Sequence, residues 1–150
     1  MQKILQTPSV QVYLHEDIDQ PNHSSEGMIK AALRDFIGGI TLNCKEPLPP
    51  IYWNKSDTST YCAVAVGTVE VGIDIECLRK RRFEKLSERY FHVDEITDDI
   101  EIFYDLWCQK EAYTKWKKGK IANYMKEKIT MPMTPLYELP SGITGYLCYA

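Results

Sequence analysis

The sequence lacks the features that mark several large classes of protein. No apolar segment approaches the ~20 residues that a helix needs to cross a lipid bilayer. The first ten residues, MQKILQTPSV, do not contain the continuous apolar stretch of a secretion signal. There is no internal repeat and no low-complexity segment. We therefore expect a cytoplasmic protein without a membrane partner.

Cysteine and histidine are too few and too scattered for a zinc site. The five cysteines are an odd number without a CxxC pair, and the three histidines do not stand at a matching spacing. We expect the thiols to be reduced, as in the cytosol, and we assign no role to the histidines.

The sequence also has no excess of basic residues. Lys and Arg number 18 against 21 Asp and Glu, which gives a net charge of −3. Such a balance gives no general attraction to nucleic acid or to an anionic membrane, so a phosphate ligand would have to be bound by local basic residues. The length of 150 residues and the hydrophobic fraction of 44% fit one domain over 1–150, or two small halves that share a core.

The pattern of apolar residues predicts an α+β fold, with helices packed against a mainly antiparallel sheet. Residues 9–16 alternate as a strand does, and residues 100–119 have the clearest helical periodicity in the chain. Two β-rich runs, 60–66 and 69–76, on either side of Gly67-Thr68 indicate a hairpin. The remaining predictions, in chain order, are a helix within 22–40 capped by Ser24 or Ser25 and ended by Gly38-Gly39, a Pro-rich loop over 43–59, a basic connector over 77–86, a helix followed by a loop over 87–99, and short strands after 121 with a turn at Pro140-Ser141-Gly142.

The predicted strand VEVGIDIE (69–76) carries several carboxylates on one face. Its alternation places four aliphatic side chains on the core face, whereas Glu70, Gly72, Asp74 and Glu76 share the other. Neighbours on that face are roughly 7 Å apart, so the acids raise each other's pKa unless a cation is near. Gly72 leaves room for a ligand or for another backbone. The strand is either a ligand site for Mg²⁺ or Ca²⁺, which prefer oxygen atoms, or simply a strand with one solvated face.

The predicted helix at 100–119 carries two aromatic residues, an acid and a base at a spacing of four. Phe103, Trp107, Glu111 and Lys115 therefore form one stripe, and Lys110 lies beside it. One interpretation is an ordinary amphipathic helix with a surface ion pair. The other is that this acid and base serve the same site as the carboxylate strand.

Taken together, the two segments resemble a known family. Val71-Gly72-Ile73-Asp74 fits a (V/I)-G-(I/V)-D strand, and WCQKEAYTK (107–115) fits a W-(S/C)-x-K-E-(A/S)-x-x-K helix. These are the signatures of the 4′-phosphopantetheinyl transferases, and the chain is similar to that family over roughly 40–120. RYFHVDE (89–95) also resembles the family's R-x-F-x-x-x-E segment, and Lys118-Gly119 its K-G.

The position of the acids is similar to that in the surfactin-synthetase-type branch of the family. About seventy residues precede Asp74, and Glu76 supplies the second acid typical of that branch. The resemblance implies a compact pseudodimer of two α+β halves, here about 1–65 and 66–150, with the site between them. The chain is short for this branch, so either both halves are trimmed or a partner chain completes the site. A monomer and a dimer both remain open.

The resemblance also implies a reaction. Such enzymes move 4′-phosphopantetheine from coenzyme A to a serine of an acyl or peptidyl carrier protein and release 3′,5′-ADP. Asp74, Glu76 and Glu111 would hold Mg²⁺ against the diphosphate, and Lys115, with Lys110 as a second candidate, would pair with phosphate. Either Glu111 or a metal-bound water would take the serine proton.

Further basic residues are candidates for binding the donor and the acceptor. For the 3′-phosphate of coenzyme A, the resemblance implies Lys45 and the pair Lys55-Ser56, where a lysine replaces the family's usual histidine. The basic run 79–82 is either a surface that steers an acidic carrier protein or a solvated loop. The alternative function is that of a catalytically degenerate relative that binds coenzyme A or a partner.

Overall fold

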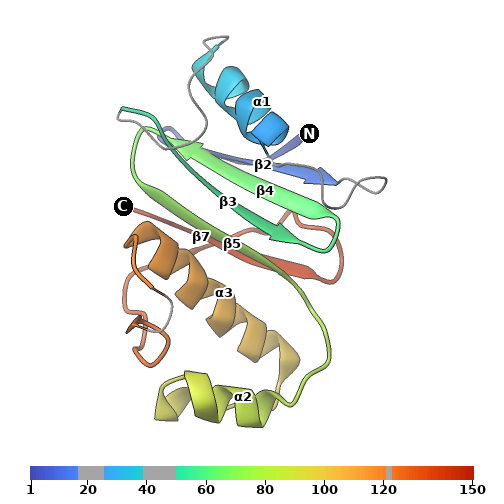
Figure 1. The fold of residues 1–150 in the computed structure, drawn as a ribbon, viewed down its shortest axis with the longest axis vertical. Coiled ribbons are helices and arrows are strands. Elements are labelled where there is room, and N and C mark those ends of the chain that lie inside the picture. Colours follow the sequence, from blue (N-terminus) through green and yellow to red (C-terminus); the bar gives the residue numbers. More distant parts are fainter. Residues whose placement is uncertain (17–25, 39–49, 121–122) are drawn as a thin grey trace.

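Two antiparallel sheets form the centre of the molecule (Figure 1). The computed structural model describes residues 1–16, 26–38, 50–120 and 123–150. The first sheet has the order β1-β2-β4-β3 and the second β5-β7-β6. The strands are β1 (Gln2–Gln6), β2 (Val10–Glu16), β3 (Tyr52–Thr58), β4 (Tyr61–Gly67), β5 (Val71–Cys77), β6 (Thr134–Pro135) and β7 (Ile143–Tyr149), and the helices are α1 (Glu26–Ile37), α2 (Phe83–Tyr90), the short 3₁₀ helix η1 (Val93–Glu95) and α3 (Ile100–Trp116).

The first sheet is covered on its outer face by α1. Side chains on that face, among them Tyr13 and Val64, pack against Ile29 and Leu33 of the helix. The helix ends as the sequence predicts: Gly38 has a φ of +81°, and its N–H donates to the carbonyl of Arg34 at 3.0 Å. The predicted serine caps lie outside the described residues.

The inner faces of the two sheets share one hydrophobic core. Ile73 and Ile75 of β5 are fully buried there against Val12 of β2 and Leu147 of β7. The apolar alternation predicted for 69–76 is therefore confirmed. On the outer face of the second sheet lies α3, so that α1 and α3 flank the joined sheets from opposite sides (Figure 1).

The predicted hairpin between 60–66 and 69–76 is wrong. Strand β4 pairs with β2 and β3, and β5 pairs with β7. Beside β3, three backbone N–H groups of β5 donate to side chains instead of carbonyls. The pairs are Ile73 with Asn54 Oδ1 (2.9 Å), Ile75 with Ser56 Oγ (3.1 Å) and Cys77 with Thr58 Oγ1 (3.0 Å). The two sheets are thus joined by a seam of side-chain hydrogen bonds between β3 and β5.

The loop predicted over 43–59 also needs correction, because Tyr52–Thr58 forms β3. The polar residues at alternate positions of β3 are the hydrogen-bond acceptors of the seam. Because they are polar, this segment lacks the alternating apolar pattern by which a strand is usually recognised. The first strand, β1, was not predicted. Helix α2 begins at Phe83, inside the connector predicted over 77–86, and not at the predicted residue 87. The strand within 9–16, helix α3 and the turn at 140–142 are confirmed. No helix in the described ranges is both long and apolar enough to span a bilayer.

Candidate active site

The two motifs meet because Gly72 lets α3 approach β5 closely. A Cβ atom at this position would stand 2.1 Å from the carbonyl oxygen of Ala112 and 2.5 Å from the amide nitrogen of Trp116. Both are backbone atoms of α3, so they cannot move aside as a flexible side chain could. Of the two possibilities that the sequence left open for this glycine, the structure shows close contact with another backbone. The carboxylate face of β5 is consequently covered by α3.

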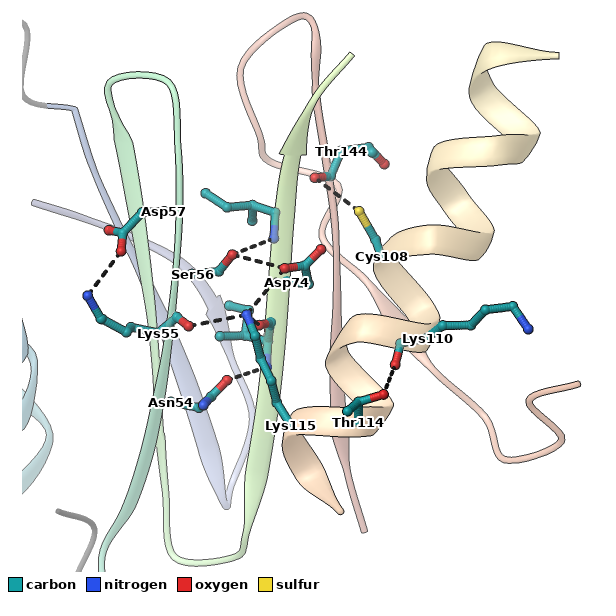
Figure 2. Close-up of polar contacts among 12 residues, drawn as sticks. Asn54, Lys55, Ser56, Asp57, Asp74, Cys108, Lys110, Thr114, Lys115 and Thr144 are labelled. Atoms are coloured by element: carbon teal, nitrogen blue, oxygen red, sulfur yellow. Dashed lines mark hydrogen bonds and ion pairs between the residues drawn. The ribbon is translucent and has the colours of Figure 1, made fainter. Parts of the chain in front are cut away.

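Asp74 lies at the centre of this contact and is only 4% exposed. Its Oδ1 atom accepts a hydrogen bond from Ser56 Oγ at 3.1 Å and lies 3.2 Å from Lys115 Nζ (Figure 2). Its Oδ2 atom is buried and has no hydrogen-bond partner among the described residues. Burial raises the pKa of Asp74 to about 7, although Lys115 opposes the rise. A buried, half-satisfied carboxylate is costly to the fold and therefore marks a site with a function.

Glu76 and Glu111 are half-buried beside Asp74. Burial, followed by the Glu111 carboxylate, raises the pKa of Glu76, although the nearby Trp107 indole and Lys115 oppose the rise. Burial likewise raises the pKa of Glu111, and the nearby Lys115 opposes that rise. Both glutamates add to the rise in the pKa of Asp74. One strand and one helix thus bring three carboxylates into a single electrostatic neighbourhood.

These carboxylates suit a hard divalent cation. Their donor atoms are all oxygens, as Mg²⁺ prefers, and the unpartnered Oδ2 of Asp74 provides a free acceptor. Within the described ranges, however, no three His, Cys, Asp or Glu side chains are gathered closely enough to hold a metal ion. Binding would therefore draw the carboxylates closer together than they lie here.

Lys115 is the cation of this neighbourhood. Its ammonium group donates to the carbonyl of Ile73 at 2.8 Å and to Asp74 Oδ1, and it lies 3.4 Å from the carbonyl of Lys55 (Figure 2). It thus reaches from α3 across the seam between β3 and β5. An ammonium group with these contacts can neutralise a carboxylate or, if a cation takes over that carboxylate, a phosphate.

The residues predicted to bind coenzyme A are distributed differently. Lys55 makes a half-exposed ion pair with Asp57 at 3.0 Å and also belongs to the surface beside Lys115. Ser56 is buried; its hydroxyl donates to Asp74 and accepts the N–H of Ile75, so its single proton is already used. In this structure Ser56 orients Asp74 and does not offer a donor to a phosphate. Lys45 lies outside the described residues.

Lys110 is not part of this neighbourhood, which corrects its prediction as a second phosphate-binding lysine. Its side chain is fully buried and points away from Asp74 (Figure 2). Its ammonium group pairs with Glu95 at 2.9 Å and also donates to the carbonyl of Glu127. Because successive helical residues differ by about 100° in direction, a neighbour of Glu111 in sequence faces another side of α3.

Two contributors to the site were missed by the sequence reasoning. Cys108 is buried beneath the carboxylates, and its thiol lies 3.9 Å from the carbonyl of Thr144. Asn54 binds the N–H of Ile73 and so fixes β3 beside the site. Helical spacing from Glu111 and Lys115 places Cys108 on an adjacent part of the helix surface, which is a usable signal. The role of Asn54 has no signal in the sequence because it depends on the pairing of distant strands.

The fold and the site define an α+β protein in which carboxylates from a strand and a helix surround a buried aspartate that pairs with a lysine. Residues 70–129 match the family model described as the 4′-phosphopantetheinyl transferase superfamily, and this stretch contains β5, α2 and α3. Over these residues the chain is similar to the 4′-phosphopantetheinyl transferase superfamily. The match suggests phosphopantetheinyl transferase activity in general. No curated protein matches the sequence.

Proposed function

We propose that this protein transfers 4′-phosphopantetheine from coenzyme A to a serine of an acyl or peptidyl carrier protein, in a Mg²⁺-dependent reaction that releases 3′,5′-ADP. The observation that supports this most is the environment of Asp74. A carboxylate with a buried and unpartnered oxygen, two further carboxylates and one lysine is the set of groups that a cation and a diphosphate together would satisfy.

Each residue then has a defined part in the proposed reaction. Asp74, Glu76 and Glu111 would hold Mg²⁺, which supplies positive charge at the diphosphate. Lys115, when relieved of Asp74, would pair with a phosphate oxygen. The serine oxygen forms a bond to the phosphorus nearest the pantetheine, and the bond from that phosphorus to the bridging oxygen breaks, so that 3′,5′-ADP leaves.

Glu111 is our candidate for the general base. Its raised pKa makes it a stronger proton acceptor than an exposed glutamate, and it is half-buried on the face of α3 that carries Lys115.

The finer assignments implied by the resemblance also remain proposals: the surfactin-synthetase-type branch, a pseudodimer with halves at about 1–65 and 66–150, and a cytoplasmic location. The oligomeric state, monomer or dimer, is open.

A second candidate is a non-catalytic relative that binds coenzyme A or a partner. It is favoured by Ser56 and Lys55, since the first has no free donor and the second makes an ion pair with Asp57. These are the two described positions at which we expected a contact with the 3′-phosphate of coenzyme A. Such a protein would rise in melting temperature with coenzyme A and yet transfer nothing.

A labelling assay separates the two functions. The protein is incubated with a fluorescent coenzyme A analogue and a panel of acyl and peptidyl carrier proteins, with Mg²⁺ or with EDTA. The transferase predicts label on the serine of at least one carrier, in Mg²⁺ only. A carrier whose serine is replaced by alanine is the control. A rise in melting temperature with coenzyme A, without label on any carrier, would instead establish the binding module.

A further inference from the structure

The buried ion pair between Lys110 and Glu95 has no part in the chemistry described so far. Lys110 is wholly buried, and the side chain of Glu95 is 10% exposed. The ammonium group also lies 5.5 Å from the centre of the Phe91 ring and donates to the carbonyl of Glu127. Placing two charges in a protein interior is expensive, and a pair of apolar residues would often serve stability as well. The pair therefore calls for an explanation other than stability.

The pair joins three segments of the chain. The Oε1 atom of Glu95 that binds Lys110 also accepts the N–H of His92 at 3.1 Å, which fixes the turn at 92–95. Next to that turn, the ring of Phe91 stacks on Phe103 of α3 at a centroid distance of 5.0 Å. Through the carbonyl of Glu127, Lys110 also holds the segment that follows α3. The helix is thus attached, on the side away from β5, to the segments that precede and follow it.

The opposite side of α3 is held to β5 through Lys115, whose ammonium group donates to the carbonyl of Ile73 at 2.8 Å and to Asp74 Oδ1. At Gly72, where the backbones of the strand and the helix approach each other closely, the strand has no side chain to interlock with the helix. A rotation of α3 would carry Glu111 and Trp107 away from Glu76 of β5, since both side chains move with the helix. Lys110, which holds the other side of the helix, is one residue before Glu111. Its pair with Glu95 therefore controls the direction of the Glu111 side chain most directly.

We propose that the Lys110–Glu95 pair is a positioning device, which sets the rotation of α3 and so holds Glu111 and Trp107 toward β5. Lys110 touches no substrate in this scheme and acts through its neighbours. The inference rests on the proposed function for its effect on catalysis, but its effect on geometry can be measured independently. The chain also offers a matched control, because Lys128 and Asp94 form an exposed ion pair at 3.1 Å between the same turn and the same following segment.

The test compares three variants of the buried pair: Lys110→Met, Glu95→Gln and the two changes combined. The control combines Lys128→Met with Asp94→Asn and so removes the exposed pair. Lys110→Met leaves Glu95 buried and unpaired, so we expect its Tm to fall by about 10 °C. In the double variant no buried charge remains and the glutamine still accepts the N–H of His92, so we expect most of the Tm to return. The control should change the Tm by less than about 3 °C.

Two readouts separate positioning from simple stabilisation. The first is the NMR resonance of the Trp107 indole N–H, which reports the position of the indole relative to Glu76 and requires no metal, coenzyme A or carrier. The second is Mn²⁺ affinity by EPR titration. For the double variant at recovered Tm, we expect a shifted indole resonance and at least tenfold weaker Mn²⁺ binding, with a lower kcat and an unchanged KM for coenzyme A.

An unshifted Trp107 resonance in the double variant would overturn the inference and leave the pair a stabilising contact only. If the double variant does not recover its Tm, the Trp107 resonance is compared between Glu95→Gln and the wild type, because the glutamine still accepts a hydrogen bond from Lys110. An unshifted resonance in Glu95→Gln would then overturn the inference. Absence of carrier labelling by the wild-type protein would remove the proposed function and leave the indole result standing.

Discussion

The Nζ atom of Lys115 lies 3.2 Å from Oδ1 of Asp74, whereas the Oδ2 atom of the same carboxylate is buried without a partner in the described part of the chain. The lysine thus neutralises a carboxylate whose second oxygen remains available. A divalent cation that binds Asp74 competes with Lys115 for it. Binding of the cation and release of the lysine toward a phosphate are therefore linked, since two cations on one carboxylate repel each other.

Lys115→Met should destabilise the metal-free protein by about 3 kcal/mol, because it leaves the Asp74 carboxylate unpaired in the interior. Mn²⁺ should then raise the Tm of the variant more than that of the wild type. Thermal unfolding in EDTA and in Mn²⁺ measures both. Lys118→Met, which removes an exposed ion pair to Glu70, is the control and should leave the stability nearly unchanged. An equal rise with Mn²⁺ in both proteins would show that Lys115 and the cation do not compete.

Glu111→Gln should retain the fold and lose at least about 100-fold in the rate of carrier labelling, because it removes both a carboxylate from the site and the candidate base. Labelling rates and a circular dichroism melt measure the two effects. Glu101→Gln, an exposed change in the first turn of the same helix, should label at the wild-type rate. Retention of activity in Glu111→Gln would exclude Glu111 as the base.

Gly72→Ala should destabilise the protein by about 3 kcal/mol, since the added methyl group would meet backbone atoms of α3 and force it away from β5. Chemical denaturation provides the measurement. At Gly27 in α1, a Cβ atom meets nothing within 4 Å, so Gly27→Ala should instead stabilise by about 0.5–1 kcal/mol. A neutral result at Gly72 would mean that α3 and β5 do not approach as closely as described.

The stability of the first sheet should depend on pH through Asp35. The Tyr13 hydroxyl donates to Asp35 at 2.8 Å, and this bond, followed by that from Lys3, lowers the pKa of Asp35 below its ordinary value of 3.8. A lowered pKa gives stability that is present above the ordinary value and is lost as the pH falls through the folded value. Asp35→Asn should therefore have a lower Tm than the wild type at pH 7.

The difference in Tm between Asp35→Asn and the wild type should shrink between pH 4 and pH 2.5. Asp98→Asn, at an exposed position, is the control and should parallel the wild type throughout. A difference that stays constant with pH would mean that the Asp35 carboxylate is not stabilised by folding.

The sequence was sufficient for features that depend on local periodicity. Alternation in 69–76 placed Asp74 and Glu76 on the face opposite the core, and helical spacing placed Glu111 and Lys115 on one side of α3. The face of each element follows from its own residues. The approach of the two faces was a hypothesis from motif resemblance, and Gly72 explains it physically.

Features that depend on distant partners could not be predicted in this way. The hairpin was placed between neighbouring runs, whereas β5 pairs with β7, about seventy residues later in the chain. The sequence places Lys110 next to Glu111, whereas its partner in the structure, Glu95, lies 15 residues earlier in the chain. In both cases packing between residues that are far apart in the sequence determines the partner. The pattern of neighbouring residues carries no information about such pairings.

The side-chain seam between β3 and β5 has a consequence for how the protein loses activity. Its hydrogen bonds end on Asn54, Ser56 and Thr58, so the two sheets can separate without breaking a backbone ladder in either. Such an opening would pull the carbonyl of Lys55 away from Lys115 and release Asp74 from Ser56. Mild denaturant should therefore abolish the proposed transferase activity, and speed amide exchange at Ile73 and Ile75, at concentrations where both sheets are still folded.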